Sequence, residues 1–214
     1  MINYKTIHGS GEALYEIQKS RFLTFIQHVS TEADAKEFIE KIRKLHWEAR
    51  HCCSAFIIGE HGSLQKADDD GEPSGTAGKP LLEVLKKQSL SDLVIVVIRY
   101  FGGIKLGAGG LIRAYGKAAT LGIEASQVVV KTLFARVKLS IDYALLGSVE
   151  NHLRQEEINV EDKFFADKVT LVLLFPVEKA SLLQQGLLDL TSAQCHFEEC
   201  GSTYLDIPYD EEKS

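Results

Sequence analysis

The sequence lacks any apolar run long enough to cross a membrane and any segment that resembles a secretory signal. Its longest such run, Leu93 to Ile98, is far shorter than the roughly 20 residues that span a bilayer. The first residues have neither the basic start nor the apolar core of a signal peptide. We therefore predict a cytoplasmic protein without a membrane partner.

Cysteine is scarce, and the four cysteines are not spaced as a metal site requires. Cys52 and Cys53 are adjacent, and Cys195 and Cys200 are separated by a segment that includes His196. Structural zinc sites use closely spaced cysteine pairs or paired histidines. The H-E-x-x-H and G-K-[ST] motifs are absent as well. We therefore expect no bound metal and no cofactor, and we assign no catalytic residue.

The sequence also has no overall excess of positive charge, which limits non-specific binding to nucleic acids. Its net charge is −6, but residues 131–214 carry 8 Lys and Arg against 15 Asp and Glu, whereas residues 1–130 carry 16 against 15. Within residues 79–117 the count is 7 basic against 2 acidic. The basic residues there are Lys79, Lys86, Lys87, Arg99, Lys105, Arg113 and Lys117. We therefore predict a local basic face on an acidic protein.

The apolar pattern of residues 1–130 predicts an N-terminal domain of mixed strands and helices. Strands are expected over 5–8, 13–17, 21–29, 52–58 and 93–99, and helices over 32–46, 80–88 and 111–125. The run from Leu93 to Arg99 is typical of a strand buried on both faces. Two glycine-rich loops, 59–78 and 100–110, precede the second and third helices. A short strand or linker is expected at 128–130.

Beyond residue 131 the pattern becomes more regular. It predicts strands over 134–141, 158–165, 168–175 and 194–203, and helices over 143–155 and 177–190. The order βαββαβ is the ferredoxin-like arrangement. We therefore predict an α+β protein with an N-terminal domain (1–130), a ferredoxin-like domain (131–206) and an exposed acidic tail (207–214).

The first glycine-rich motif, ADDDGEPSGTAGKP (67–80), places carboxylates just before a helix. Its backbone N–H groups and Lys79 favour an anion at the helix start, whereas the carboxylates repel one unless Mg²⁺ bridges the two. The alternative is an ordered loop in which the carboxylates bond to backbone N–H groups and cap turns. The candidate anion or metal loop consists of Asp69, Asp70, Glu72, Ser74, Gly75 and Thr76.

The second motif, VVIRYFGGIKLGAGGLIRAYGKAA (96–119), leads from a buried strand through two glycine pairs into a helix. Its glycines allow close approach of a ligand to the backbone, and Arg113 and Lys117 share one helix face. A tight turn that only packs the helix on the sheet is the alternative. We favour a ligand-facing loop. The predicted ligand- or RNA-binding residues are Lys79, Arg99, Tyr100, Phe101, Gly102, Gly103, Lys105, Gly109, Gly110, Arg113, Tyr115 and Lys117.

Together the two motifs closely resemble the signature of the IMPACT/YigZ family. The matching stretches are DDGEPSGTAGKP (69–80) and VVIRYFGGIKLGAGGLIRAYGKA (96–118), and the segments 19–22 and 49–55 resemble earlier stretches of the family. Cys52 stands where the family usually has Asn, which is expected to weaken any polar contact at that position.

The resemblance implies both a fold and a role in translation. The N-terminal domain is expected to share its fold with a small-subunit ribosomal protein and with domain IV of elongation factor G. The C-terminal domain is expected to resemble domain V of that factor. Eukaryotic relatives regulate translation initiation and carry an extra N-terminal protein-binding domain, so this chain looks like the two-domain bacterial form.

We therefore expect a regulatory binding protein that contacts RNA, the ribosome or a translation factor through the basic glycine-rich face. The basic side chains would contact phosphates, and Tyr100, Phe101 and Tyr115 are available for stacking on bases. A protein-interaction partner that binds a basic surface through its acidic C-terminal domain is a further possibility.

An enzyme is the less favoured alternative. It would be a Mg²⁺-dependent hydrolase or phosphotransferase in which Asp69, Asp70 and Glu72 hold the metal and His51 acts as a base. A nucleophilic pair of Cys53 and His51 is not expected, because both side chains are predicted to face the core.

Overall fold

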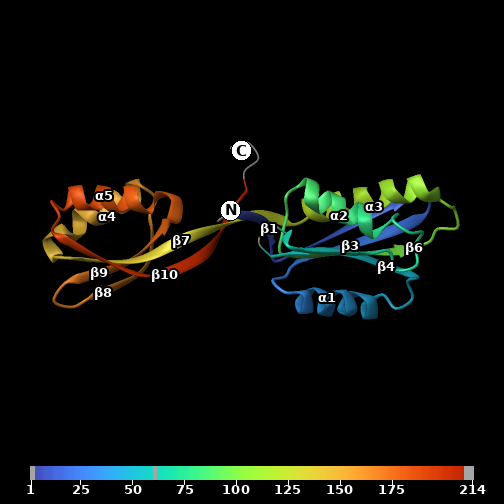
Figure 1. The fold of residues 1–214 in the computed structure, drawn as a ribbon, viewed down its shortest axis with the longest axis horizontal. Helices are drawn as coiled ribbons and strands as arrows, with labels where there is room; N and C mark the ends of the chain where they lie inside the picture. The colour runs from blue at the N-terminus through green and yellow to red at the C-terminus, as the bar shows by residue number, and fades with distance from the viewer. Residues whose placement is uncertain (1–2, 60–61, 210–214) are drawn as a thin grey trace. The chain divides into compact units, whose positions relative to one another are not determined.

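The computed structural model describes residues 3–59 and 62–209 and divides the chain into two compact units (Figure 1). Of the described residues, unit 1 contains those of 3–131 together with 206–209, and unit 2 contains Thr132–Leu205. Both units combine helices with antiparallel strands, so the predicted α+β class is confirmed. No helix in the described ranges has the length and apolar character of a membrane span.

The core of unit 1 is a five-stranded sheet in the order β2-β3-β6-β4-β5. Its strands are β2 (Ser10–Ile17), β3 (Ser20–His28), β4 (His51–Ile58), β5 (Leu64–Asp68) and β6 (Leu93–Tyr100). The central strand β6 is buried from Leu93 to Arg99, as its β-branched run predicts. The register places Arg99 opposite both His51 of β4 and Phe22 of β3.

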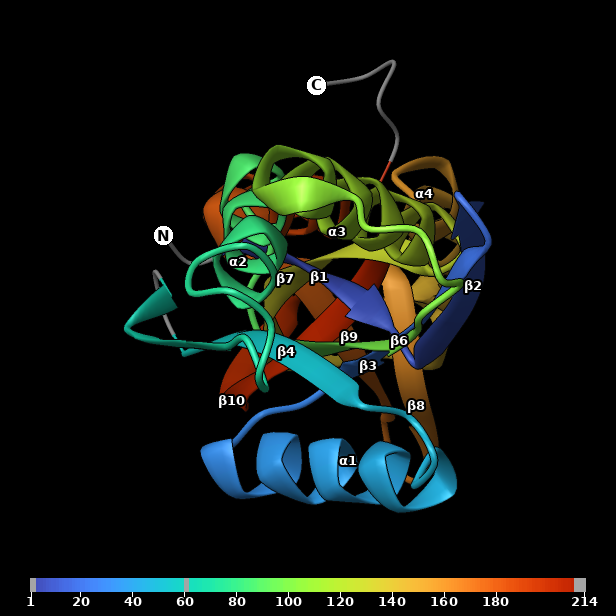
Figure 2. The ribbon, with the colours of Figure 1, turned by 90° about the vertical axis from the view of Figure 1, so that its right-hand side faces the viewer.

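Helices cover both faces of this sheet (Figures 1 and 2). The helix α1 (Glu32–Leu45) lies on one face, and α2 (Gly78–Lys87) and α3 (Gly107–Glu124) lie side by side on the other. The Thr31 side chain caps α1 by accepting a hydrogen bond from Asp34 N at 3.1 Å. Two separate apolar clusters fill the space between the sheet and its two helical layers.

Several boundaries in unit 1 differ from the predicted ones. The expected loop 59–78 contains the edge strand β5, whose exposed side chains give no apolar signal because only its backbone pairs with β4. Tyr100 belongs to β6 rather than to the second loop. The helix α3 begins at Gly107 instead of position 111, so Gly109 and Gly110 lie in its first turn.

Unit 2 follows the predicted βαββαβ order. The strands β7 (Gln127–Ile141), β8 (Asn159–Phe165), β9 (Val169–Pro176) and β10 (Cys195–Pro208) form a sheet in the order β10-β7-β9-β8. The helices α4 (Leu146–Gln155) and α5 (Ala180–Leu190), each preceded by a short 3-10 turn, lie together on one face of the sheet (Figure 1). This arrangement is consistent with the ferredoxin-like fold.

Two strands pass from one unit into the other. The strand β7 runs without a break through positions 128–130, where the sequence predicts a short strand or linker, and its first residues pair with β1 (Tyr4–His8). The strand β10 continues to Pro208, and in unit 1 Asp206 bonds to Lys131 Nζ at 2.6 Å and to His8 Nδ1 at 2.7 Å.

The predicted loose tail therefore needs correction at its start. Residues 207 and 208 belong to β10, and Tyr209 N donates a hydrogen bond to Val128 O at 3.2 Å. The rest of the predicted tail lies outside the described residues.

The helix α3 packs against β3 through a position that has no room for a side chain. A Cβ atom at Gly122 would lie 2.4 Å from Thr24 Cγ2, whereas a Cβ at Gly116 of the same helix would meet nothing within 4 Å. We expect Gly122→Ala to lower the free energy of unfolding by about 1–3 kcal/mol through overpacking. Gly116→Ala should raise it by about 0.5–1 kcal/mol because alanine favours the helix. Urea unfolding of both variants checks this, and equal changes in the two would contradict it.

Candidate nucleic-acid interface

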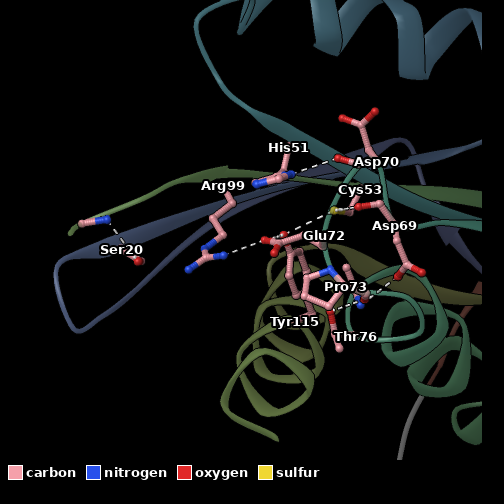
Figure 3. Close-up of polar contacts among 12 residues, drawn as sticks. Ser20, His51, Cys53, Asp69, Asp70, Glu72, Pro73, Thr76, Arg99 and Tyr115 are labelled. Atoms are coloured by element: carbon pink, nitrogen blue, oxygen red, sulfur yellow. Dashed lines mark hydrogen bonds and ion pairs between the residues drawn. The ribbon is translucent and has the colours of Figure 1, made fainter. Parts of the chain in front are cut away.

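The two glycine-rich motifs meet at one end of the unit 1 sheet, where β6 ends and β4 begins (Figure 3). The carboxylate of Glu72, from the first motif, lies between Arg99 and Tyr115 of the second. Arg99 comes from the end of β6, and Tyr115 comes from the third turn of α3. The two motifs therefore form a single polar centre inside the protein.

The Glu72 carboxylate is the acceptor at this centre. Its Oε1 atom accepts a hydrogen bond from Arg99 Nη1 at 2.7 Å and another from Tyr115 OH at 2.8 Å. Only 3% of the Glu72 side chain and 7% of the Arg99 side chain are exposed. A buried charge is costly unless it is paired and hydrogen-bonded, so each of these groups requires the other.

Tyr115 is held from two further sides. Its ring is fully buried and packs edge-on against Phe22, with the ring centroids 5.1 Å apart. Its hydroxyl oxygen lies 3.3 Å from Cys53 Sγ. Burial and the neighbouring thiol and carboxylate raise the pKa of Tyr115, so the phenol stays protonated and donates to Glu72.

Asp69 folds the first motif onto the start of α2. One carboxylate oxygen accepts from Gly75 N at 2.7 Å, and the other accepts from Ala77 N and Gly78 N at 3.0 and 2.9 Å. Burial opposes ionisation, but these three donors lower the pKa of Asp69 below its ordinary value. Asp69 therefore satisfies backbone groups at the start of α2 that would otherwise lack a partner.

The two hydroxyl residues of the motif do not cap this helix. The Thr76 hydroxyl donates to Pro73 O at 2.6 Å, and Ser74 is exposed. Gly75 adopts a φ of +75°, which turns the loop back towards Asp69. The interpretation in which carboxylates bond to backbone N–H groups therefore describes Asp69, whereas Glu72 bonds to side chains.

Asp70 joins the loop to α1 and β4. Its Oδ1 atom accepts from Arg43 Nη1 at 3.0 Å, and its Oδ2 atom accepts from Cys52 N at 2.6 Å. The contact at position 52 is made by the backbone, while the Cys52 side chain is buried in the apolar cluster beneath α1. This contact is made by the backbone and so does not depend on the side chain at position 52.

Cys53 and His51 also face the loop, but they do not form a nucleophile and base. Burial raises the pKa of the Cys53 thiol well above its ordinary value, and Sγ lies 3.0 Å from Asp69 O. The nucleophilic form of cysteine is the thiolate, which this setting disfavours. His51 Nδ1 donates to Asp70 O at 2.9 Å, so the imidazole holds the loop backbone.

The carboxylates of the first motif do not converge on one point. Asp69 faces backbone amides, Asp70 faces Arg43 and β4, and Glu72 faces Arg99 and Tyr115. No group of three or more His, Cys, Asp or Glu side chains in the described ranges is placed to hold a metal ion. The geometry therefore gives no support to the Mg²⁺-dependent hydrolase alternative.

The second loop is fixed to the β2–β3 turn at Gly102. Gly102 N donates to Ser20 Oγ at 3.2 Å, and a Cβ atom at Gly102 would lie 2.0 Å from Lys19 C. Only glycine can approach the turn this closely. Gly103 and Gly107 adopt positive φ angles of 86° and 69° and face open space. The loop thus combines one tight anchor with an exposed remainder.

The first turn of α3 is exposed and has no capping side chain. Its N-cap residue, Leu106, makes no side-chain cap, and no acidic residue occurs in the first turn. A Cβ at Gly109 would lie 3.6 Å from Arg113 Nη1, so the Arg113 guanidinium lies against this turn. The backbone N–H groups of a helix start and a nearby guanidinium both favour an anion.

The structure separates the predicted binding residues into exposed and buried sets. Lys79, Lys105, Arg113, Lys117 and Phe101 are exposed, as are Gly103 and Gly109, while Gly102 and Gly110 are half-buried. Arg99 and Tyr115 are buried and joined to Glu72, so the predicted phosphate contact of Arg99 and base stacking of Tyr115 are corrected to internal roles. Tyr100 is half-buried, and its hydroxyl bonds to His46 Nδ1 at 3.0 Å.

Two residues of the site were not predicted from the sequence. Arg43 binds Asp70 from α1, and Ser20 binds Gly102 from the start of β3. Arg43 looked like one of many charges on a helix, and no pattern connects it with the first motif. Ser20 lies in a stretch, 19–22, that resembles the family, and that resemblance was the available signal.

Comparison with known proteins agrees with this architecture. Residues 18–123 match the Impact N-terminal domain, and residues 139–194 match a domain of unknown function, DUF1949. The IMPACT family member YvyE of Bacillus subtilis is 46% identical over 204 residues, which cover 95% of this chain and 94% of that protein. The chain belongs to the IMPACT family. The predicted family resemblance is therefore confirmed.

Other relatives show how widely the IMPACT family extends. YigZ of Escherichia coli is 35% identical over 178 residues, covering 82% of this chain and 87% of that protein. A crystal structure described as that of a hypothetical protein covers 99% of both chains with a TM-score of 0.60 and 30% identity. Membership of the IMPACT family suggests a translation-related regulatory role.

Loss of Glu72 alone is expected to destabilise the protein more than loss of both charges of the buried Glu72–Arg99 pair. Glu72→Ala should lower the free energy of unfolding by about 3–5 kcal/mol, because it leaves the Arg99 charge buried without a partner. The double variant Glu72→Leu, Arg99→Met removes both charges and should lose less than the single variant. Urea unfolding of the three proteins measures this, and a double variant less stable than Glu72→Ala would refute it.

Asp69 predicts a stability effect that depends on pH. Because its pKa is lowered in the folded state, its contribution is present above the unfolded pKa of about 3.9 and is lost as pH falls through the folded pKa. Asp69→Asn should cost about 2 kcal/mol at neutral pH, and the difference from wild type should shrink in acid. Urea unfolding at neutral and acidic pH tests this, with the exposed Glu37→Gln of α1 as control. A deficit that stays constant would be inconsistent with it.

Proposed function

We propose that this protein is a translation-associated regulatory protein that binds the phosphate backbone of RNA through the exposed basic surface around the start of α3. This surface, called the α3 basic surface below, consists of Lys105, Arg113, Lys117 and the backbone N–H groups of the first turn of α3. Lys79, at the start of the neighbouring α2, adds a further exposed charge. Since ribosomes work in the cytoplasm, the proposal includes a cytoplasmic location.

The observation that carries the proposal is the uncapped first turn of α3. Residues 107–109 of this turn are exposed, no acidic side chain lies in the turn, and the Arg113 guanidinium lies beside Gly109. Phosphate groups bind at such helix starts, and Lys and Arg supply most of the sequence-independent affinity for RNA. The family relationship supports translation as the setting.

The three predicted site carboxylates of the first motif are held within the protein, whereas Asp68 of the same motif is exposed. Each of the three has an internal donor, namely backbone amides for Asp69, Arg43 for Asp70 and Arg99 for Glu72. A paired carboxylate has a much weaker field outside the protein than a free one. A basic surface can therefore act locally although the net charge of the chain is −6.

Co-sedimentation with ribosomal subunits over a salt series tests the proposal. Binding of the wild type should weaken steadily with salt, because phosphate contacts release counterions. The variant Lys105→Glu, Arg113→Glu, Lys117→Glu should bind at least about 10-fold more weakly and show a shallower salt dependence.

A matched control reverses three charges elsewhere in unit 1. Lys41→Glu, Lys44→Glu, Arg50→Glu changes exposed residues on and just after α1, which covers the opposite face of the sheet. The control has the same net charge as the test variant and should bind like the wild type. Equal loss in both variants would show a general charge effect, and binding insensitive to salt would point to a protein partner; either result rejects the proposal.

A further inference from the structure

The three aromatic side chains of the second motif differ in what they offer to a ligand. Tyr115 is fully buried, and Tyr100 is half-buried and held by His46. Phe101 is 50% exposed at the end of β6, immediately before the glycine anchor. Of these three rings, Phe101 is therefore the one with a large exposed surface.

The Phe101 ring is supported from inside the protein. Its centroid lies 5.5 Å from Arg99 Cζ, and the Arg99 guanidinium is in turn fixed by Glu72. Phe22 also lies 5.5 Å from Arg99 Cζ. A cation and the face of an aromatic ring attract each other. The Arg99 guanidinium, fixed by Glu72, therefore restricts the position of the exposed Phe101 ring.

The backbone on each side of Phe101 is also held. Tyr100 pairs with Arg21 in the sheet, and Gly102 is bonded to Ser20 and lies against the backbone of Lys19. A side chain that is already ordered loses little conformational entropy when it binds. Phe101 is thus a preorganised apolar platform, joined to the uncapped start of α3 by the segment 102–106.

We propose that the exposed part of the Phe101 ring stacks on one unpaired base, so that the RNA bound by the α3 basic surface is single-stranded at this point. The inference rests on the proposed function, because the phosphate contacts of the α3 basic surface hold the strand. Every base has a flat face that can stack on an aromatic ring, and bases in a duplex already use their faces for each other. The platform therefore selects unpaired strands without selecting a sequence.

The test measures binding of the full chain to two RNA probes of the same sequence by fluorescence anisotropy. One probe is single-stranded and the other is annealed to its complement. The wild type should bind the single strand more tightly than the duplex. In Phe101→Leu the ratio of the duplex Kd to the single-strand Kd should fall by roughly 5- to 100-fold, as expected for loss of one stacked base. Phe101→Trp, which keeps an aromatic face, should retain the ratio.

The outcomes separate the stacking inference from the proposed function. Salt-dependent binding of both probes with a ratio unchanged by Phe101→Leu overturns the stacking inference and leaves the α3 basic surface as the RNA contact. If Phe101→Leu loses affinity for both probes by the same factor, the stacking inference is also overturned, because that result marks a general loss of structure. Failure of the wild type to bind either probe overturns both proposals.

Discussion

The burial of one carboxylate, that of Glu72, is the constraint on which the arrangement of the two glycine-rich motifs in unit 1 depends. A carboxylate removed from water requires donors, and here they come from the end of a strand and from the middle of a helix. Arg99, once fixed by Glu72, supports Phe101, and Phe101 precedes the loop that leads into α3. The interior ion pair and the anchor of Gly102 on Ser20 therefore both contribute to the position of this exposed loop.

The neighbouring aspartates, Asp69 and Asp70, hold the backbone of the first motif in place. Asp69 and Asp70 act on backbone amides and on Arg43, which holds the first motif against α2, α1 and β4. Their carboxylates are bonded within the protein, whereas Asp68 of the same motif is exposed. The proposed phosphate contact is therefore compatible with the carboxylates that are bonded internally.

The sequence predicted the elements that have a strong apolar pattern and failed where a role depends on distant partners. The apolar patterns of residues 93–99 and 32–46 predicted β6 and α1 correctly, whereas β5 was missed because its side chains are exposed. Arg99 and Tyr115 were predicted to bind RNA, because arginine and tyrosine in a glycine-rich motif are typical of RNA contacts as well as of buried polar pairs. Their burial follows from Glu72, which lies 27 and 43 positions away in the chain. Such a long-range pairing leaves no local pattern.

The way the chain enters and leaves unit 2 has a consequence for its synthesis. Because Thr132–Leu205 lies between the two parts of unit 1, unit 2 is in effect an insertion near the end of the unit 1 sequence. On the ribosome the N-terminal part emerges first, but Lys131 and His8 receive Asp206 only after all of unit 2 has been made. A chain that stops early leaves these two side chains without their acidic partner. Unit 1 emerges first, but it can be completed only after the ribosome has translated the whole of unit 2.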